Sequence, residues 1–484
     1  MSMSNSFIFF GCWNNINCDK EAIYRDVVLN CIKHFEPEIN NMFIAGDNWY
    51  NTLIKNKENK DDSYKYYLVD TLVSGYHILY SMNKNIYICV GNHDEAVSDK
   101  SKTPDCMIKT QKHYINKLKK YIDDKTRDFE KVNSALPEAS KLLLGTSSDY
   151  SEKTIKTFLD EPLPFIEELE ANDELTNTSN NVLKLYADKD IGLCEDASTS
   201  YIVIIINTNI LSPSYLTEVN NKIIEANTKK GNKNKLIFVM GHIPLFYDKH
   251  KKDKAAKSAK EKGEKGEKGE KEDITKLKKG VFGESSVLID ELYDILAEHS
   301  CIYLCADCHN FNIMKIKKGD KCVIQITSGT GGADPDIIKD LKEKKVVQLS
   351  GYDISYYSIN SYGYCKITVE PCSSGSGRKS SSGSSSVIVS YNKIIAADSD
   401  NKSIDELYVY NIRNNEIEYR DTTLTIEEKE KIKKGILAKA KNNKEFYCGR
   451  VAQYNNAENK EGREKNVIKS KNAEKTVCYI KKGK

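Results

Sequence analysis

Side chains that can bind metals follow a series of short apolar runs in this 484-residue chain, each at the point where a run ends. The runs are rich in β-branched and aromatic residues and end in Gly or polar loops, a pattern typical of buried strands. They are Phe7–Phe10, Met42–Ala45, Ile86–Val90, Tyr201–Ile206, Leu236–Met240, Ile302–Cys305 and Val323–Thr327. The side chains that follow them are Asp47, Tyr50, Asn92, His93, His242, Asp307 and His309.

Helical patterns lie between several of these predicted strands. Ala22–His34 and Ser285–Glu298 show apolar residues at helical spacing. Buried strands that alternate with helices indicate an α/β sheet, in which functional side chains gather at the strand ends. We therefore expect the polar residues above to lie close together.

The residue types at these strand ends suit the hydrolysis of a phosphate ester. That reaction needs positive charge on the phosphoryl oxygens, an activated water and a proton donor for the leaving group. Two metal ions ~3.5–4 Å apart supply the first two. They are held by a bridging carboxylate together with imidazole, amide or phenolate ligands on rigid elements. Each motif alone is weak, and it is their order along the chain that carries the prediction.

That order is strand-GD-x-x-Y, strand-GNHD, strand-GH-x-P and strand-x-D-x-H-N. It resembles the calcineurin-like metallophosphoesterase superfamily, and within it the tartrate-resistant type of purple acid phosphatase, which carries GDWG, GDNFY, GNHD, GHYP and GHDHN motifs. The resemblance spans about Phe7 to Thr422 and includes "NTNIL", "ITSGTGG" and "SYGYCKITV". It implies an α/β protein with a four-layer α/β/β/α sandwich, the metallophosphoesterase fold, here with low-complexity insertions and a basic C-terminal tail.

The resemblance also implies a role for individual residues. Asp47 would be the carboxylate that bridges two metal ions. Tyr50 and His309 would bind the first metal, and Asn92 and His242 the second.

Other positions match the motif without being metal ligands. His93 would act beside the substrate, stabilising the phosphoryl transition state or protonating the leaving oxygen, and Asn92 and His93 would contact the substrate. Trp13 matches the Trp of GDWG, and Asn310 the Asn after the paired histidines.

Two departures from the family pattern fall on metal ligands. Cys12 stands where the family has an Asp that binds the first metal, and Asp307 where it has a His that binds the second. Ala306 and Cys308 also differ from the family residues. A thiolate and a carboxylate are both competent ligands. Cys12 would favour zinc or ferrous iron, and Asp307 would suit manganese or magnesium, so the expected cofactors are two metal ions drawn from Fe, Zn and Mn.

Two functions remain open on these residues. The first is a phosphohydrolase with a dinuclear metal site, acid-phosphatase-like, acting on phosphomonoesters. The second is a catalytically degenerate phosphatase fold kept as a structural or binding protein, a pseudoenzyme. The two altered ligand positions are what separate these hypotheses.

Charge and composition divide the chain into a predicted body and additions. The overall charge of +3 combines +6 over 249–280 and +9 over 423–484 with an acidic remainder. Through this basic loop and tail the chain could contact nucleic acid, an anionic surface or a protein partner. The predicted organisation is a domain over 1–422 with a helical insertion (98–181), a Lys/Glu-rich disordered loop (249–280) and a Ser/Gly-rich loop (373–386), followed by a basic helical or mobile tail (423–484).

Targeting signals are not apparent in the sequence. The longest aliphatic run, Ile202–Ile206, is far shorter than the ~20 residues of a membrane span, and the N-terminus lacks the features of a signal peptide. Fourteen cysteines without a secretory signal are typical of reduced thiols. The expected location is intracellular, in the cytoplasm.

Three further patterns have alternative interpretations. "CADCH" has the C-x-x-C-H spacing of haem attachment, and Cys305 and Cys308 have the spacing of a zinc pair. A disulfide or shared metal between Cys12 and Cys308 is an alternative if both line one cleft. Gly329–Gly332 could cradle a phosphate, but it lacks the Lys-Ser/Thr of a P-loop and is better interpreted as a tight loop bordering the site.

Overall fold

The structure is a computed structural model of the whole chain. It describes residues 5–17, 20, 22–50, 64–65, 69–80, 82, 84–94, 108, 111–112, 115, 183–232, 235–248, 277–280, 287–336, 341–370, 386–394, 406–422, 436–438, 440–441, 444 and 480–481.

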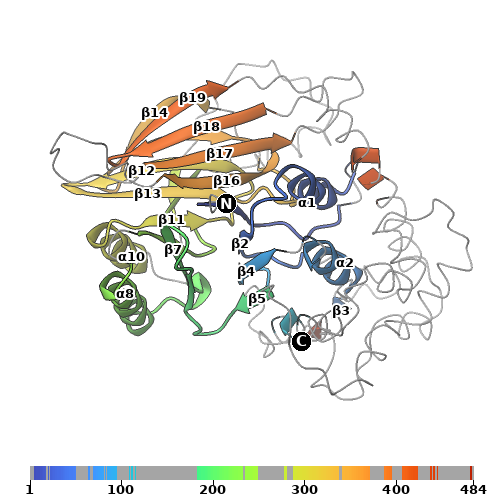
Figure 1. Cartoon of the computed structure of the whole chain (residues 1–484), viewed down its shortest axis with the longest axis horizontal. Coiled ribbons are helices and arrows are strands. Elements are labelled where there is room, and N and C mark those ends of the chain that lie inside the picture. The colour runs from blue at the N-terminus through green and yellow to red at the C-terminus, as the bar shows by residue number, and fades with distance from the viewer. Residues whose placement is uncertain are drawn as a thin grey trace, which may run out of the picture.

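Two eight-stranded sheets dominate these residues (Figure 1). The first contains, in spatial order, β19 (Glu416–Thr422), β18 (Glu406–Arg413), β17 (Ser386–Ile394), β16 (Tyr362–Glu370), β1 (Ser6–Phe10), β2 (Asn41–Ala45), β4 (Asn85–Cys89) and β5 (Leu183–Tyr186). The second contains β14 (Leu341–Leu349), β15 (Tyr352–Ile359), β12 (Phe311–Lys318), β13 (Lys321–Ser328), β11 (Ile302–Cys305), β8 (Leu236–Met240), β7 (Tyr201–Ile205) and β6 (Gly192–Glu195).

Helices cover the outer face of each sheet. Figure 1 shows α1 (Tyr24–Phe35) and α2 (Val69–Tyr80) on one side of the molecule, and α8 (Pro213–Thr228) and α10 (Val287–Glu298) on the other. Three buried apolar cores separate the layers: one under α1 and α2, one between the sheets, and one under α8 and α10. The predicted four-layer α/β/β/α sandwich is therefore confirmed.

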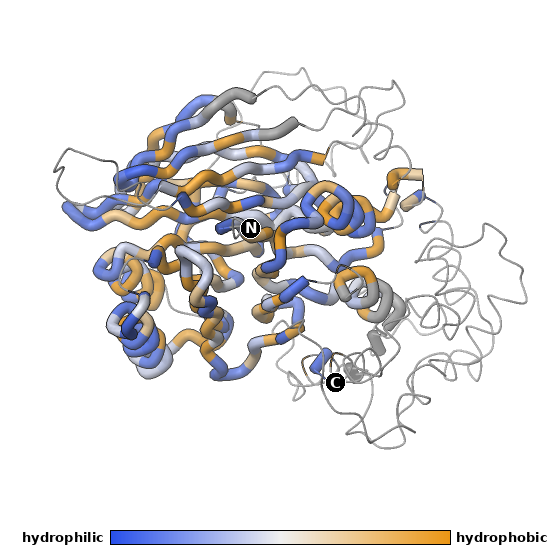
Figure 2. The backbone as a smooth tube through the Cα atoms, in the orientation of Figure 1, coloured by the Kyte–Doolittle hydropathy of each residue, from blue (hydrophilic) through white to orange (hydrophobic). Residues whose placement is uncertain are grey.

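The central strands are apolar at every position because their side chains alternate between two faces that are both buried. In β1, Phe7 and Phe9 point into the core between the sheets, whereas Ile8 and Phe10 point toward α1 and α2. Successive side chains of a strand face opposite sides of its sheet, so a strand with helices on one face and a second sheet on the other must be apolar at every position. In the outer strand β17 it is burial that alternates, from Ser386 to Tyr391, and Figure 2 shows hydrophilic and hydrophobic positions interspersed along the outer strands.

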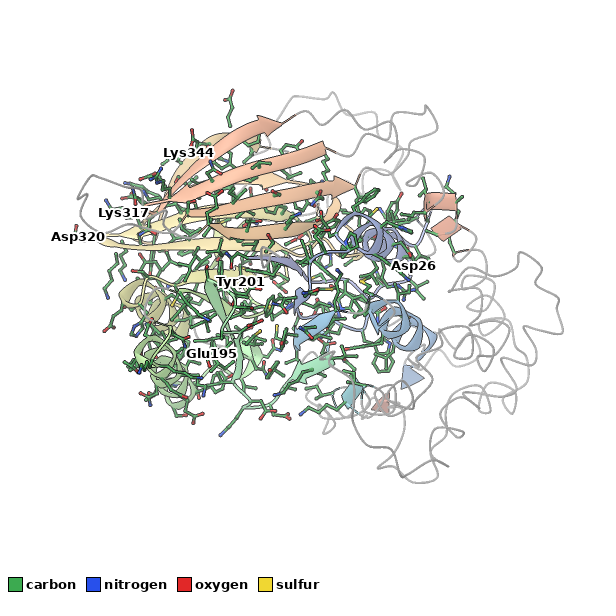
Figure 3. All side chains as sticks on the ribbon, in the orientation of Figure 1. Asp26, Glu195, Tyr201, Lys317, Asp320 and Lys344 are labelled. Carbon is green, nitrogen blue, oxygen red and sulfur yellow. The ribbon has the colours of Figure 1, made fainter. Side chains whose placement is uncertain are left out.

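The two sheets also meet through one buried polar contact. The side-chain amide of Asn41 on β2 donates a 2.8 Å hydrogen bond to the hydroxyl of Tyr201 on β7, whose ring packs against Phe7 and Phe238. Figure 3 labels Tyr201 in the middle of the molecule, and Lys317 and Asp320 at its left edge, where β12 turns into β13.

All seven predicted strands and both predicted helices are present, with ends shifted by at most two residues. The turn between β18 and β19 lies at "RNN" (413–415). Asn414 and Asn415 both have positive φ, as a two-residue hairpin requires. α2 and α8 are the described helices that the patterns did not predict.

Two of the predicted additions contain described residues that pack against the body. Leu277–Lys279, inside the segment 249–280 predicted to be disordered, form β10, which pairs antiparallel with β9 (Phe246–Asp248) because Leu277 is buried against the outer core. In the predicted tail, Ile436 and Ala440 are buried in the core under α1. These two residues of the predicted tail therefore pack against the body.

The remaining additions fall largely outside the described residues. Most of 98–181, most of 249–280, 373–385 and most of 423–484 are in this category. Near the end of the tail, β20 (Ile480–Lys481) pairs with β3 (Tyr64–Lys65). In the described part of the chain, every helix is too short or too polar to cross a membrane.

Candidate metal centre

The loops that follow β1, β2 and β11 each contain a non-glycine residue with left-handed backbone geometry. The φ angles are +49° at Cys12, +54° at Asp47 and +56° at Asp307. Such angles are uncommon for residues with a Cβ and are retained where the surrounding structure enforces them, often at functional sites. Here the Cys12 amide donates to the carbonyl of Gly46, which ties the first two loops together.

Four side-chain atoms converge in a first group. The phenol of Tyr50 donates a 2.7 Å hydrogen bond to Oδ2 of Asp47, and its oxygen lies 2.9 Å from Nε2 of His309. The thiol of Cys12 lies 3.7 Å from the same Asp47 oxygen. The ligand atoms of Cys12, Asp47 and His309 all lie within 4.8 Å of one another.

A second group of atoms surrounds Nε2 of His242. This nitrogen lies 3.1 Å from Oδ1 of Asn92, 3.2 Å from Oδ1 of Asp47 and 3.7 Å from Oδ1 of Asp307. His242 and Asp47 are buried, Asp307 is half-buried, and Asn92 is exposed. The two oxygens of Asp47 therefore face different groups: Oδ2 faces Tyr50 and Cys12, and Oδ1 faces His242.

Backbone carbonyls hold both histidine rings in one orientation. Nδ1 of His242 donates to the carbonyl of Ala45 at 2.6 Å, and Nδ1 of His309 donates to the carbonyl of Asp334 at 2.7 Å. A carbonyl only accepts, so Nδ1 carries a hydrogen in each ring and Nε2 is the ring nitrogen that faces the site. A hydrogen bond of this kind on the remote nitrogen is the usual support of a metal-binding histidine.

Both donor groups gather several acceptors around few protons. In the first group, Nε2 of His309 and Oδ2 of Asp47 share the protons of the Tyr50 phenol and the Cys12 thiol. In the second group, three oxygens face one nitrogen of His242. A cation in each group would satisfy all of these acceptors at once. The chemistry of the two donor sets therefore fits two metal ions, with Asp47 between them.

Burial and charge shift the pKa values of these groups strongly. Burial, and then the charge of Asp47, raise the pKa of the Cys12 thiol and of the Tyr50 phenol well above their usual ranges. Burial opposes ionisation of Asp47, but nearby His242 lowers its pKa below the usual carboxyl range. Burial also disfavours a charged His242, yet its contact with Asp47 raises its pKa to about 9. Without a metal, the site thus holds protons that a metal would displace.

His93 has a different environment from the expected ligands. Its side chain is exposed, and its ring lies 4.7 Å from the Tyr50 ring, measured between centroids. Its backbone amide donates a 3.1 Å hydrogen bond to Oδ1 of Asp47. The imidazole therefore lies at the rim of the site, where a substrate would approach.

The sequence had assigned no role to Asp94, the last residue of GNHD. Its buried carboxylate accepts hydrogen bonds from the backbone and side-chain amides of Asn48, from the amide of Gly91 and from the side chain of Gln111, all at 2.7–3.1 Å. Trp13 donates from Nε1 to the side-chain oxygen of Asn48 at 3.0 Å. This network joins the loops that carry Cys12, Asp47 and Asn92. Burial, and then the charge of Asp47, raise the pKa of Asp94 to about 7.

Two further residues support the site, one within "NTNIL" and one just beyond "ITSGTGG", and neither had a predicted role. The hydroxyl of Thr208, in "NTNIL", accepts from the backbone amides of His242 and Ile243. Asp336, just beyond "ITSGTGG", accepts from the backbone amide of His309 at 3.0 Å. In the sequence, the only indication of these roles was that a hydroxyl residue and a carboxylate residue lie in or near these segments.

The glycine segment Gly329–Gly332 packs beneath the Cys12 loop. A Cβ on Gly329 would lie 2.0 Å from the carbonyl oxygen of Cys308 and 3.3 Å from the sulfur of Cys12, and one on Gly331 would lie 2.5 Å from Cβ of Trp13. The segment is thus the tight loop bordering the site, as expected.

All eight side chains predicted for the site lie in this region: Cys12, Asp47, Tyr50, Asn92, His93, His242, Asp307 and His309. Two matched residues lie outside it. Trp13 supports Asn48, and the side-chain amide of Asn310 donates to the carbonyl of Asp248.

The cysteine alternatives receive no support from the described residues. The Cys305 thiol packs in the outer core, 3.3 Å from the Thr327 hydroxyl, and no potential metal-binding cluster among the described residues contains it. Cys12 and Cys308 are not joined by a disulfide.

Among the comparisons with known proteins, the one with solved structures gives a match. No protein-family model matches the chain, and no curated protein sequence matches it. Among solved structures, a purple acid phosphatase from seeds of yellow lupin (Lupinus luteus) is similar at 11% sequence identity and a TM-score of 0.39. The match covers 84% of this chain and 53% of the lupin chain, about half its length. The four-layer architecture therefore rests on the strand pairing and cores described above.

Proposed function

We propose that this chain is a metal-dependent phosphohydrolase that acts on phosphomonoesters through a dinuclear site, and that it is related to the purple acid phosphatases. Cys12, Tyr50 and His309 would hold one metal, Asn92, His242 and Asp307 the other, and Asp47 both. The observation that carries the proposal is the division of the Asp47 carboxylate, whose two oxygens face two separate donor groups.

When bound, two such metals supply positive charge to phosphoryl oxygens and lower the pKa of water. The chain's own side chains would do the rest. Asp47 orients both donor groups, and the carbonyls of Ala45 and Asp334 keep the Nε2 atoms of His242 and His309 facing inward. His93, exposed beside Tyr50, would bind a phosphoryl oxygen or donate a proton from its imidazole to the leaving oxygen.

The alternative, a degenerate fold that binds without catalysis, depends on Cys12. Burial and the charge of Asp47 raise the pKa of its thiol, and a thiol binds a metal as the thiolate. Binding a metal must therefore remove this proton. If the metal cannot, the first group stays empty and the reaction loses one of its two cations.

The test is turnover of p-nitrophenyl phosphate by the full chain, supplied in turn with Zn²⁺, Mn²⁺, Mg²⁺ and Fe²⁺ and compared with the double variant Cys12→Asp/Asp307→His. We expect the parent to be active and the double variant to prefer a different metal. Activity in the double variant alone would mean that the parent is the degenerate form. Inactivity of both with every metal would contradict the proposal.

A further inference from the structure

Cys12 is the feature of this site that phosphate hydrolysis does not explain. Its side chain is fully buried, and its sulfur faces the Oδ2 atom of Asp47 at 3.7 Å. It lies within a cluster with Asp47 and His309 whose ligand atoms are all within 4.8 Å, so it is part of a set of donors.

The backbone and the packing around Cys12 hold its sulfur on the site side. Its amide donates to Gly46 at 3.0 Å, and its carbonyl accepts from Ala333 at 2.9 Å. Beneath it, a Cβ on Gly329 would approach the sulfur to 3.3 Å, so a side chain there would crowd the thiol. These bonds hold the Cys12 backbone in place, with its buried sulfur beside Asp47, before any ligand binds.

The spacing of these donors suits a small tetrahedral ion. With a Zn–S bond of ~2.3 Å and a Zn–O bond of ~2.0 Å, two tetrahedral ligands lie ~3.5 Å apart. The sulfur and Oδ2 of Asp47 are 3.7 Å apart, so an ion could bind both with a small adjustment. Tyr50 and His309 would complete four ligands once their hydrogen bonds of 2.7 and 2.9 Å open to tetrahedral spacing.

The other donor group has a different chemistry. Around Nε2 of His242 the neighbours are oxygens of Asn92, Asp47 and Asp307. Oxygen ligands suit harder cations, whereas thiolate selects softer ones such as Zn²⁺. Of the two donor groups around the shared Asp47 carboxylate, one therefore contains sulfur and the other does not, so the two can be compared within one molecule.

We propose that Cys12 binds a Zn²⁺-class ion as a thiolate, together with Asp47, His309 and Tyr50. On binding, the sulfur–metal bond forms and the thiol proton passes to solvent. The inference rests on the proposed metal site, but it concerns the identity of the ion and not the reaction.

Cobalt(II) replaces Zn²⁺ as a spectroscopic probe, because a thiolate–Co²⁺ bond gives an intense near-ultraviolet charge-transfer band and oxygen or nitrogen ligands do not. We expect this band when Co²⁺ is added to the metal-depleted full chain. It should be lost in Cys12→Ser and in Cys12→Asp, and retained in Cys308→Ser, which removes a neighbouring buried thiol. X-ray absorption of the zinc-loaded chain should show one sulfur at ~2.3 Å.

Co²⁺ binding without the band, a band that survives Cys12→Ser, or a failure to bind either metal would each overturn the inference. Folding of each variant is checked by circular dichroism. Cys12→Asp retains a competent metal ligand at this position, whereas Cys12→Ser leaves only a weaker one. A Cys12-dependent band without phosphatase turnover would leave this inference standing and contradict the proposed function. Turnover without sulfur ligation would do the reverse.

Discussion

Nε2 of His242 lies 3.2 Å from Oδ1 of Asp47, and both side chains are buried. His242 follows β8 in one sheet and Asp47 follows β2 in the other, so this contact joins the two sheets at the edge where the site lies. Because Nδ1 of His242 donates to Ala45, only Nε2 is available to a ligand. The candidate site is therefore assembled across the interface between the sheets.

His242→Ala should remove one of the two expected metal equivalents. It deletes the only nitrogen seen among the described donors of the second group, and we expect affinity there to fall more than ~100-fold, beyond the usual effect of losing a supporting residue. Metal content after dialysis, measured by mass spectrometry, checks this. His299→Ala is the matched control, because its ring bonds to Asn220. Two retained equivalents in His242→Ala would contradict the assignment.

His93→Ala should reduce turnover while leaving the metal content unchanged. The side chain is exposed, and the backbone amide that donates to Asp47 remains. Loss of a positioned acid lowers kcat by ~10²–10⁴-fold. The loss should be larger for an alkyl phosphate than for p-nitrophenyl phosphate, whose leaving group needs less protonation. Equal losses for both substrates would instead indicate a role in binding the phosphoryl group, and unchanged kcat would exclude either role.

Asp94→Asn should destabilise the fold and loosen the site. An amide in place of the carboxyl turns one acceptor into a donor that faces the amides of Asn48, Gly91 and Gln111. Leaving such buried groups unsatisfied costs ~1–3 kcal/mol in the free energy of unfolding. Urea denaturation measures the loss, with exposed Asp353→Asn as control. A change below ~0.5 kcal/mol would show that the network is not structural.

Gly91→Ala should reduce the affinity for metal, with a smaller effect on the folding of the rest of the chain. A Cβ at Gly91 would lie 2.2 Å from Oδ1 of Asp47 and so displace this carboxylate, the proposed bridge between the metals. Gly319→Ala is the control: its φ is +60°, and nothing lies within 4 Å of the added carbon. The control should lose only ~1 kcal/mol through backbone strain and keep its metal. Equal metal binding in both variants would refute a bridging role for Asp47.

The order of the strand-end motifs predicted which side chains lie together. Apolar runs ending in "GD", "GNHD", "GH" and "CADCH" mark strands whose carboxyl ends lie together, so Asp47, Asn92, His242 and Asp307 could be expected at one edge. The same pattern could not predict α2, which lies beyond a polar stretch with no strong start signal, or β10, which is only three residues long.

The sequence by itself determined the seven predicted strands, two of the helices and the side chains that stand at the strand ends, because these depend on local apolar periodicity and on turn residues. The tertiary structure alone decided how those side chains are used. Only packing brings His309 to Tyr50, 259 residues apart in the chain, or Asp334 to the far side of the His309 ring. It also divides the oxygens of Asp47 between two donor groups and turns Cys12 inward. Such contacts depend on distances between loops of different sheets, which no local pattern encodes.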